Sequence, residues 1–170
     1  MNKLYIGIDN GVTGTIGVMA DGYSQFALTP VKKEPSYTVA KKTITRIEAV
    51  VLKAYLKQVM AEYGCGPESA LAVLERPLIN PTRFSASMSA SRALEAVLCV
   101  LEDLEIPRMY IDSKKWQKDM LPKGVTGSDE LKKASLDIAS RLFPQHGPAI
   151  KKHKDGDGIL IAEWARRCRL

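Results

Sequence analysis

The sequence has few cysteines and no apolar run long enough to predict a membrane-spanning helix. Its three cysteines, Cys65, Cys99 and Cys168, lie far apart, and none belongs to a C-x-x-C pair. A disulfide framework and a cysteine-based zinc site are therefore not expected. The first residues include no apolar signal segment, so we expect a cytoplasmic protein, in a cell or a phage-infected host, with no membrane partner.

Positive charge is in excess. The chain has 170 residues, 25 of them Lys or Arg and 19 Asp or Glu, which gives a net charge of +6. This length predicts a single domain over residues 1–170, and the basic excess favours a polyanionic partner such as nucleic acid. Any one basic pair could be a solvated helix face, but six clusters together favour nucleic acid. The clusters are Lys32-Lys33, Lys41-Lys42, Lys114-Lys115, Lys132-Lys133, 151–154 and 166–169.

Hydrophobic periodicity predicts an α/β fold. Three strands at 3–9, 14–20 and 23–29 form a meander with a turn at Asp21-Gly22, and residues 30–35 form a loop. Helices are expected at 43–63, 87–105, from 113, at 128–143 and at 155–170, with further strands at 69–75 and 108–112. A meander followed by alternating elements predicts a mixed sheet with helices packed on it.

Acidic residues end two of the apolar strands, where an unpaired charge is costly. Asp9 ends the first strand and Glu75 ends the strand at 69–75. Open α/β sheets bind ligands at the carboxyl ends of their strands, so these carboxylates converge if the strands are parallel neighbours. Carboxylates that close repel unless one is protonated or a cation is shared. Oxygen ligands without Cys or His at ligand spacing favour Mg²⁺ or Mn²⁺.

Two further acids open the last predicted helix. Asp155 and Asp157 precede an apolar run, and Gly156 and Gly158 relax the backbone around them. Asp157 is the safer ligand, because residues two apart on a regular helix face different ways. Each acid taken alone could equally be a turn residue, a strand end or a helix cap. Three such positions beside apolar sequence together favour a metal site.

The ordered set of motifs resembles RuvC-type Holliday junction resolvases, a branch of the ribonuclease H-like nuclease superfamily. The motifs are GIDNGVTGTIGVM, AVLERP and DGDGILIA, with IDSKKWQKDML and KKASLDIASRLFP between the last two. The resemblance implies a mixed five-stranded sheet flanked by helices, a homodimer, and a Mg²⁺-dependent endodeoxyribonuclease. Such an enzyme makes paired symmetric cuts in four-way DNA junctions, with two Mg²⁺ or Mn²⁺ ions per site and no nucleotide cofactor.

The resemblance assigns metal-binding and catalytic roles to particular acids. Asp9, Glu75 and Asp157 match the family's acids by position. Lys154 stands where the family has a further Asp or His, so Asp155 is expected to be the fourth ligand, with His153 in reserve.

Side chains around these acids are candidates for DNA contact. Phe84 either stacks at the branch point or folds back on the next helix, and the helix at 87–105 is expected to pack partly in the core and partly on a second copy. The basic residues could contact phosphates, although Arg76 could instead pair with an acid and the lysines could cover a solvated helix face. These residues are Arg76, Arg83, Lys114, Lys115, Lys118, Lys152 and Lys154.

Other functions share parts of this pattern. GIDNGVTGTIGV also resembles the first phosphate loop of ASKHA-type ATP-binding proteins, but these need two lobes and no second phosphate loop is present. A related nuclease that cuts other branched DNA or RNA–DNA hybrid would use the same acids. A non-catalytic junction-binding module would keep the fold without needing them.

Overall fold

The central element is a five-stranded mixed sheet with the order β3-β2-β1-β6-β7. The computed structural model describes residues 3–170. Strand β1 pairs antiparallel with β2, β2 pairs antiparallel with β3, and β1, β6 and β7 run parallel. The predicted meander and the mixed α/β sheet are therefore confirmed. The strands are β1 Leu4–Ile8, β2 Thr15–Ala20, β3 Tyr23–Leu28, β6 Ala70–Glu75 and β7 Arg108–Ile111.

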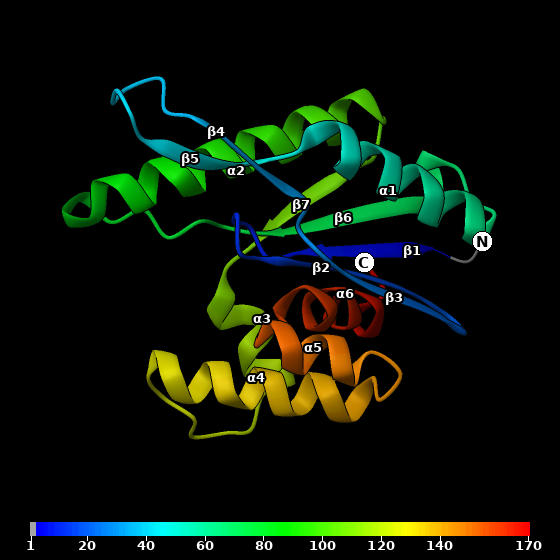
Figure 1. Cartoon of the computed structure of the whole chain (residues 1–170). Coiled ribbons are helices and arrows are strands. Elements are labelled where there is room, and N and C mark those ends of the chain that lie inside the picture. The colour runs from blue at the N-terminus through cyan, green and yellow to red at the C-terminus, as the bar shows by residue number, and fades with distance from the viewer. Residues whose placement is uncertain (1–2) are drawn as a thin grey trace.

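Helices cover both faces of the sheet (Figure 1). Helices α1 and α2 lie on one face, and α3 to α6 lie on the other. Side chains alternate along β1, so Leu4, Ile6 and Ile8 pack under α1 and α2 while Tyr5 faces the second layer. The helices are α1 Ala49–Tyr63, α2 Phe84–Asp103, α3 Ser113–Met120, α4 Ser128–Leu142, α5 Gly147–His153 and α6 Asp157–Cys168, with 3-10 turns η1 Pro67–Ser69 and η2 Pro81–Arg83.

Local sequence explains where several elements end. Gly22 lies in the two-residue β2–β3 turn with φ 73°. Gly64 ends α1 in the left-handed conformation, and its N–H donates to Ala61 O. The turn at Gly22 and the end of the helix before Gly64 were both predicted, because a glycine adopts positive φ without the strain that a Cβ causes.

Helix α6 lies unusually close to the sheet because glycines remove side chains from the contact. A Cβ on Gly7 of β1 would overlap the backbone of Ala162, and a Cβ on Gly17 of β2 would overlap that of Ile159. A Cβ on Gly158 of α6 would overlap the backbone of Thr15. The helix is thus seated directly over β1 and β2, and its first turn lies beside the end of β1.

Two expected boundaries were wrong. Residues 30–35 are mostly strand β4 (Val31–Pro35), and 43–47, assigned to a helix, form β5 (Thr43–Ile47), which pairs antiparallel with β4. The stretch 43–47 reads TITRI, whose β-branched residues favour a strand, and helix α1 begins only at Ala49. Helix α5 was also missed, because seven residues between a proline and a glycine give too short a pattern.

No apolar run was expected to reach the length that a membrane-spanning helix needs, but one helical segment passes that test. The segment Pro81–Asp103 is long and apolar enough to cross a membrane by length and composition alone. In the structure Ala93, Val97 and Leu101 of this helix pack into the core against α1 and the sheet. Its first turns instead expose apolar side chains, including Phe84 and Met88.

Replacing Gly17 with alanine tests the close packing of α6 against the sheet. The added methyl group must displace the backbone of Ile159, so we expect the free energy of unfolding to fall by roughly 3 kcal/mol. Chemical denaturation measures this change. The control is Gly147→Ala, whose new Cβ would lie 3.7 Å from Ser140 O, an ordinary contact. Equal stability of the two variants would show that α6 does not pack tightly against β2 at Gly17.

Candidate metal centre

Three carboxylates from distant parts of the chain meet at one edge of the sheet, the edge formed by the strand ends where β1 finishes. Asp9 directly follows β1, Asp155 lies two residues before α6, and Asp157 is the first residue of α6. One potential ligand atom from each lies within 4.8 Å of the others. This edge holds the carboxyl end of β1, where the sequence placed the site.

Hydrogen bonds fix the two acids near α6. The Thr15 hydroxyl donates to Asp155 Oδ1 at 2.9 Å, and the Asp157 N–H donates to the same oxygen at 2.9 Å. The Gly158 N–H in turn donates to Thr15 Oγ1 at 3.1 Å. The Ser135 hydroxyl of α4 donates to Asp157 Oδ1. Both carboxylates are therefore held at the start of α6, where the positive end of the helix dipole favours negative charge.

Asp9 is held by the loop that joins β1 to β2. Its N–H donates to Thr15 O at 3.1 Å, and a Cβ on Gly14 would overlap the backbone of Asp9. The neighbouring Asn10 donates from its side chain to Ala90 O of α2 at 3.2 Å. The loop is thus tied to α6 through Thr15 and to α2 through Asn10.

Glu75 is the fourth acid at this edge, at the end of β6, the parallel neighbour of β1. It is not part of the closest group of three, and the Trp116 indole N–H of α3 donates to Glu75 Oε2 at 2.9 Å. Trp116 is fully buried, so its N–H requires an acceptor. Trp116, Thr15 and Ser135 were not foreseen, because nothing local to their sequence positions marks them.

The electrostatics of the group disfavour full ionisation. Burial and the nearby carboxylates Asp155, Asp157 and Glu75 raise the pKa of Asp9 well above its ordinary value. Burial raises the pKa of Glu75 to about 7, with Asp157 and Asp155 adding to the rise. Burial and Asp155 raise the pKa of Asp157 to about 6. Removing water and crowding like charges both favour the protonated form, and a shared cation reverses both effects.

The donor set suits a hard divalent cation. The acids offer only oxygen atoms, they are partly buried, and they come from rigid element ends. Carboxylate oxygens of this kind are the ligands that Mg²⁺ and Mn²⁺ prefer. His153 is the last residue of α5 and is not in the closest group, while Lys154 follows it in the left-handed conformation.

The candidate DNA-contacting residues of the loop after β6 lie beside this edge. Arg76 Nε lies 3.2 Å from Asp112 Oδ1, and its guanidinium lies over the Tyr110 ring. Arg83 ends η2, and Phe84, the first residue of α2, is 71% exposed. Phe84 therefore does not fold back on its helix.

The basic candidates on α3 and at the end of α5 are all exposed. Lys114 and Lys118 line a cavity of about 440 Å³ together with Lys123 and the turn before α4. Lys115 Nζ lies 5.5 Å from the centre of the Trp164 ring. Lys152 and Lys154 are exposed at the end of α5.

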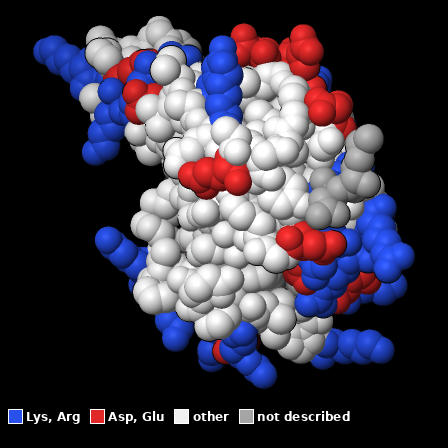
Figure 2. Space-filling view, turned by 90° about the vertical axis from the view of Figure 1, so that its right-hand side faces the viewer, with Lys and Arg blue, Asp and Glu red and all other residues white. Residues whose placement is uncertain are grey.

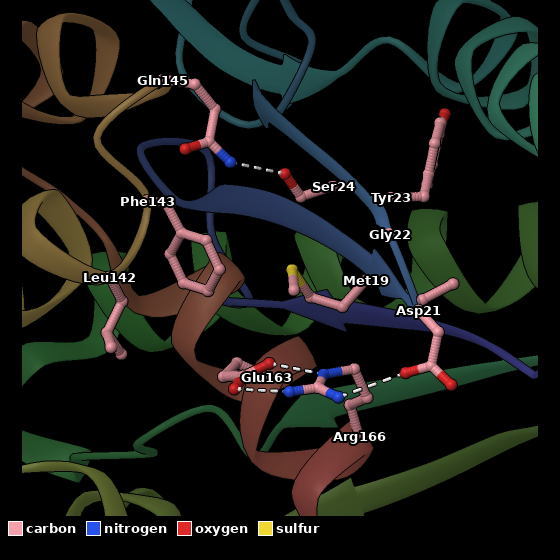
Figure 3. A pocket seen from close by; sticks show the side chains of 11 residues that line it. Met19, Asp21, Gly22, Tyr23, Ser24, Leu142, Phe143, Gln145, Glu163 and Arg166 are labelled. Carbon is pink, nitrogen blue, oxygen red and sulfur yellow. Dashed lines mark hydrogen bonds and ion pairs between the residues drawn. The ribbon is translucent and has the colours of Figure 1, made fainter.

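A second cavity of about 440 Å³ lies at the opposite edge of the sheet (Figure 3). Arg166 crosses it, with its guanidinium 2.8 Å from Glu163 and 3.3 Å from Asp21. Gln145 donates to Ser24 on its other side. The face toward this edge carries both basic and acidic side chains around a mostly uncharged surface (Figure 2). The arginine is already neutralised by its two acids, so this cavity offers no free charge to a ligand.

Comparisons with solved structures identify the architecture. RuvC of Thermus thermophilus in complex with a Holliday junction substrate superimposes with a TM-score of 0.54 at 13% identity, covering 98% of this chain and 96% of that chain. A second Thermus thermophilus RuvC structure gives 0.50 at 14% identity with the same coverage. This chain has the RuvC fold. The expected likeness to RuvC is thereby confirmed at the level of the fold, and no protein-family model or curated protein sequence matches the chain.

The raised pKa values predict how pH and metal affect stability. A carboxyl group that binds its proton more tightly when folded stabilises the protein below its unfolded pKa, and this stabilisation is lost as pH rises through the folded value. For Glu75 that window runs from 4.5 to about 7. We expect the melting temperature of the EDTA-treated protein to fall across this window, and Mn²⁺ to raise it more at pH 7.5 than at pH 5.5.

The variant Glu75→Gln separates this effect from other titrations. It removes one titrating charge from the group, so its melting temperature in EDTA should fall less between pH 4.5 and 7 than that of the unchanged protein. Calorimetry at several pH values gives both curves. Parallel curves, with no difference in Mn²⁺ response between the two pH values, would contradict the electrostatic description.

Proposed function

We propose that the protein is a divalent-metal-dependent endonuclease that cuts four-way DNA junctions in pairs of symmetric phosphodiester hydrolyses. The observation that carries the proposal is the convergence of Asp9, Asp155 and Asp157, with Glu75 beside them, at the carboxyl end of β1. A RuvC fold with four carboxylates at this edge suits phosphoryl-transfer chemistry, because their oxygens can share cations beside a phosphate.

The metal-binding roles fall to these four acids. Asp9 would be shared by two ions, and Glu75, Asp155 and Asp157 would complete the ligand sets. Mg²⁺ or Mn²⁺ bound there would activate a water molecule and stabilise the charge on the leaving oxygen. His153, outside the closest group, is not required as a ligand in this proposal.

The chain supplies the orientation of these carboxylates. The Trp116 indole N–H donates to Glu75 Oε2, and the Ser135 hydroxyl donates to Asp157 Oδ1. Hydrogen bonds from outside the ligand set hold ligand groups in a productive orientation and tune their basicity. The Thr15 hydroxyl and the Asp157 N–H both donate to Asp155 Oδ1, which fixes the orientation of this carboxylate.

DNA would bind across the edge that holds the acids. Phe84, which is exposed, would stack on a base at the branch point, beside Arg83. Phosphate contacts would come from Arg76, Lys114, Lys115, Lys118, Lys152 and Lys154. The cavity between α3 and the turn before α4 brings Lys114 and Lys118 together, and the α3 helix also carries Trp116, which contacts Glu75.

A homodimer would match the symmetry of the junction. Two cuts on opposing strands require two sites, and a two-fold axis supplies them. The exposed apolar side chains early in α2, Phe84 and Met88, with Leu78 and Ile79 before it, would lie at or near this axis. In this proposal the chain is a single cytoplasmic nuclease domain that needs no nucleotide cofactor.

The substitution Asp9→Asn tests the function. It keeps the shape of the side chain and removes the charge that both ions would share, so the cleavage rate should fall roughly 100-fold or more in Mg²⁺. Junction binding measured in Ca²⁺ should be retained. Labelled four-way junction, linear duplex and RNA–DNA hybrid are incubated with each protein, and paired symmetric nicks in the junction alone are expected.

The matched control is Asp137→Asn on α4, whose side chain is exposed and forms only a surface ion pair with Arg141. This variant should cut like the unchanged protein. Full junction cleavage by Asp9→Asn would refute the assignment of the site. Cleavage of the hybrid in preference to the junction would keep the chemistry but change the substrate.

A further inference from the structure

The β4–β5 hairpin carries most of the net charge of the protein. Residues 31–47 contain five basic residues and one acid, Glu34, and so account for four of the six net positive charges. The hairpin stands apart from the main sheet as a separate two-stranded ribbon, next to α2 (Figure 1). The basic residues are Lys32, Lys33, Lys41, Lys42 and Arg46.

Only part of this charge is neutralised within the hairpin. Lys32 and Arg46 lie opposite each other in the ribbon, and both bind the Glu34 carboxylate, at 2.6 Å and 2.8 Å. Lys33, Lys41 and Lys42 are exposed, and within residues 3–170 none of them forms an ion pair. Three cations therefore remain free to bind a partner.

The ribbon is fixed to the body of the protein. Ile47 at its base is buried in the core beneath α1 and α2. Near its tip, Tyr37 accepts a hydrogen bond of 2.9 Å from Arg92 of α2, and the same guanidinium lies over the Tyr37 ring at 5.6 Å. A two-stranded ribbon alone is marginally stable, so these contacts with α2 give it a defined position.

The base of the hairpin lies on the edge of the sheet that holds the acids. Leu28, at the end of β3, pairs with Thr15, whose hydroxyl binds Asp155. The chain then passes through Thr29, whose N–H donates to Gly14 O, and Pro30, whose carbonyl accepts from Glu48 N–H. The ribbon thus begins next to the carboxylate group and runs along the α2 side of it.

We propose that the β4–β5 hairpin is a phosphate-binding arm that grips the duplex DNA leaving the metal centre. This inference rests on the proposed nuclease function and names the part of the substrate that the hairpin contacts. Lysine ammonium groups spaced along an extended ribbon match the regular negative charge of a DNA backbone, and a two-stranded ribbon fits the major groove. The arm would raise affinity without taking part in the chemistry.

The side chains of the hairpin favour DNA over a protein partner. A protein interface typically buries apolar or aromatic anchors at its centre. The aromatic residue of the hairpin, Tyr37, is 61% exposed but already engaged by Arg92, and the tip also exposes Val39 beside lysine, threonine and alanine side chains. Binding that depends on charge alone predicts a strong dependence on salt concentration.

The test compares two double variants that each lose two positive charges. The first is Lys41→Asn with Lys42→Gln, where asparagine tolerates the positive φ of 61° at position 41. The control is Arg141→Gln with Arg169→Gln, at the ends of α4 and α6 on the opposite edge of the sheet. Binding to a labelled four-way junction and to a linear duplex is titrated in Ca²⁺ at several KCl concentrations.

We expect the hairpin variant to bind junction and duplex roughly 10-fold or more weakly at 0.1 M salt. The slope of log K against log salt should become shallower by up to about 2, since each phosphate contact contributes about 0.9. The control should keep the slope of the unchanged protein, and the cleavage rate in Mg²⁺ at saturating protein should be the same for all three.

The outcomes separate the arm from the nuclease. If the hairpin variant binds with the same affinity and slope as the control, the arm is refuted even though cleavage by the unchanged protein stands. If the unchanged protein cuts no junction but its DNA binding depends on Lys41 and Lys42, the DNA-binding role of the hairpin is supported and the nuclease function is refuted. If the hairpin variant binds DNA normally but cleaves more slowly at saturating protein, the proposed role of the hairpin in binding alone would also be refuted.

Discussion

The repulsion between carboxylates gathered at the end of β1 is the constraint on which the rest of the structure depends. Asp9, Asp155 and Asp157 come from opposite ends of the chain and lie within 4.8 Å of one another, partly out of water. Without a cation this arrangement raises the pKa values of Asp9 and Asp157 and weakens the fold at neutral pH. The chain therefore gives up stability to keep a site whose natural complement is a divalent cation.

Several features serve to hold this unfavourable group together. Gly7, Gly17 and Gly158 let α6 lie directly on β1 and β2, which brings its first turn to the end of β1. Hydrogen bonds from the chain then fix the orientation of each carboxylate near α6. Arg76, Arg83 and the exposed Phe84 follow Glu75 in the segment that leaves β6 beside these acids.

The sequence predicted most of the sheet and the place of the acids, because apolar strands that end in a charge are visible locally. Asp9 and Glu75 were expected to converge if their strands were parallel neighbours, and β1 and β6 are parallel neighbours. The supporting partners could not be predicted, since Trp116 meets Glu75 only through tertiary packing across 41 residues. The β4–β5 hairpin was missed because lysine-rich strands lack apolar alternation, and its contact with α2 depends on Arg92, which is distant in sequence.

Anomalous scattering from a crystal soaked in Mn²⁺ tests the central claim most directly. The account predicts manganese density between the carboxylates of Asp9, Asp155 and Asp157, with a second peak that Glu75 and Asp9 share. Trp116 should keep its hydrogen bond to Glu75 in that crystal. Carboxylates that stay in place with no manganese between them, or that move apart into solvent, would contradict it.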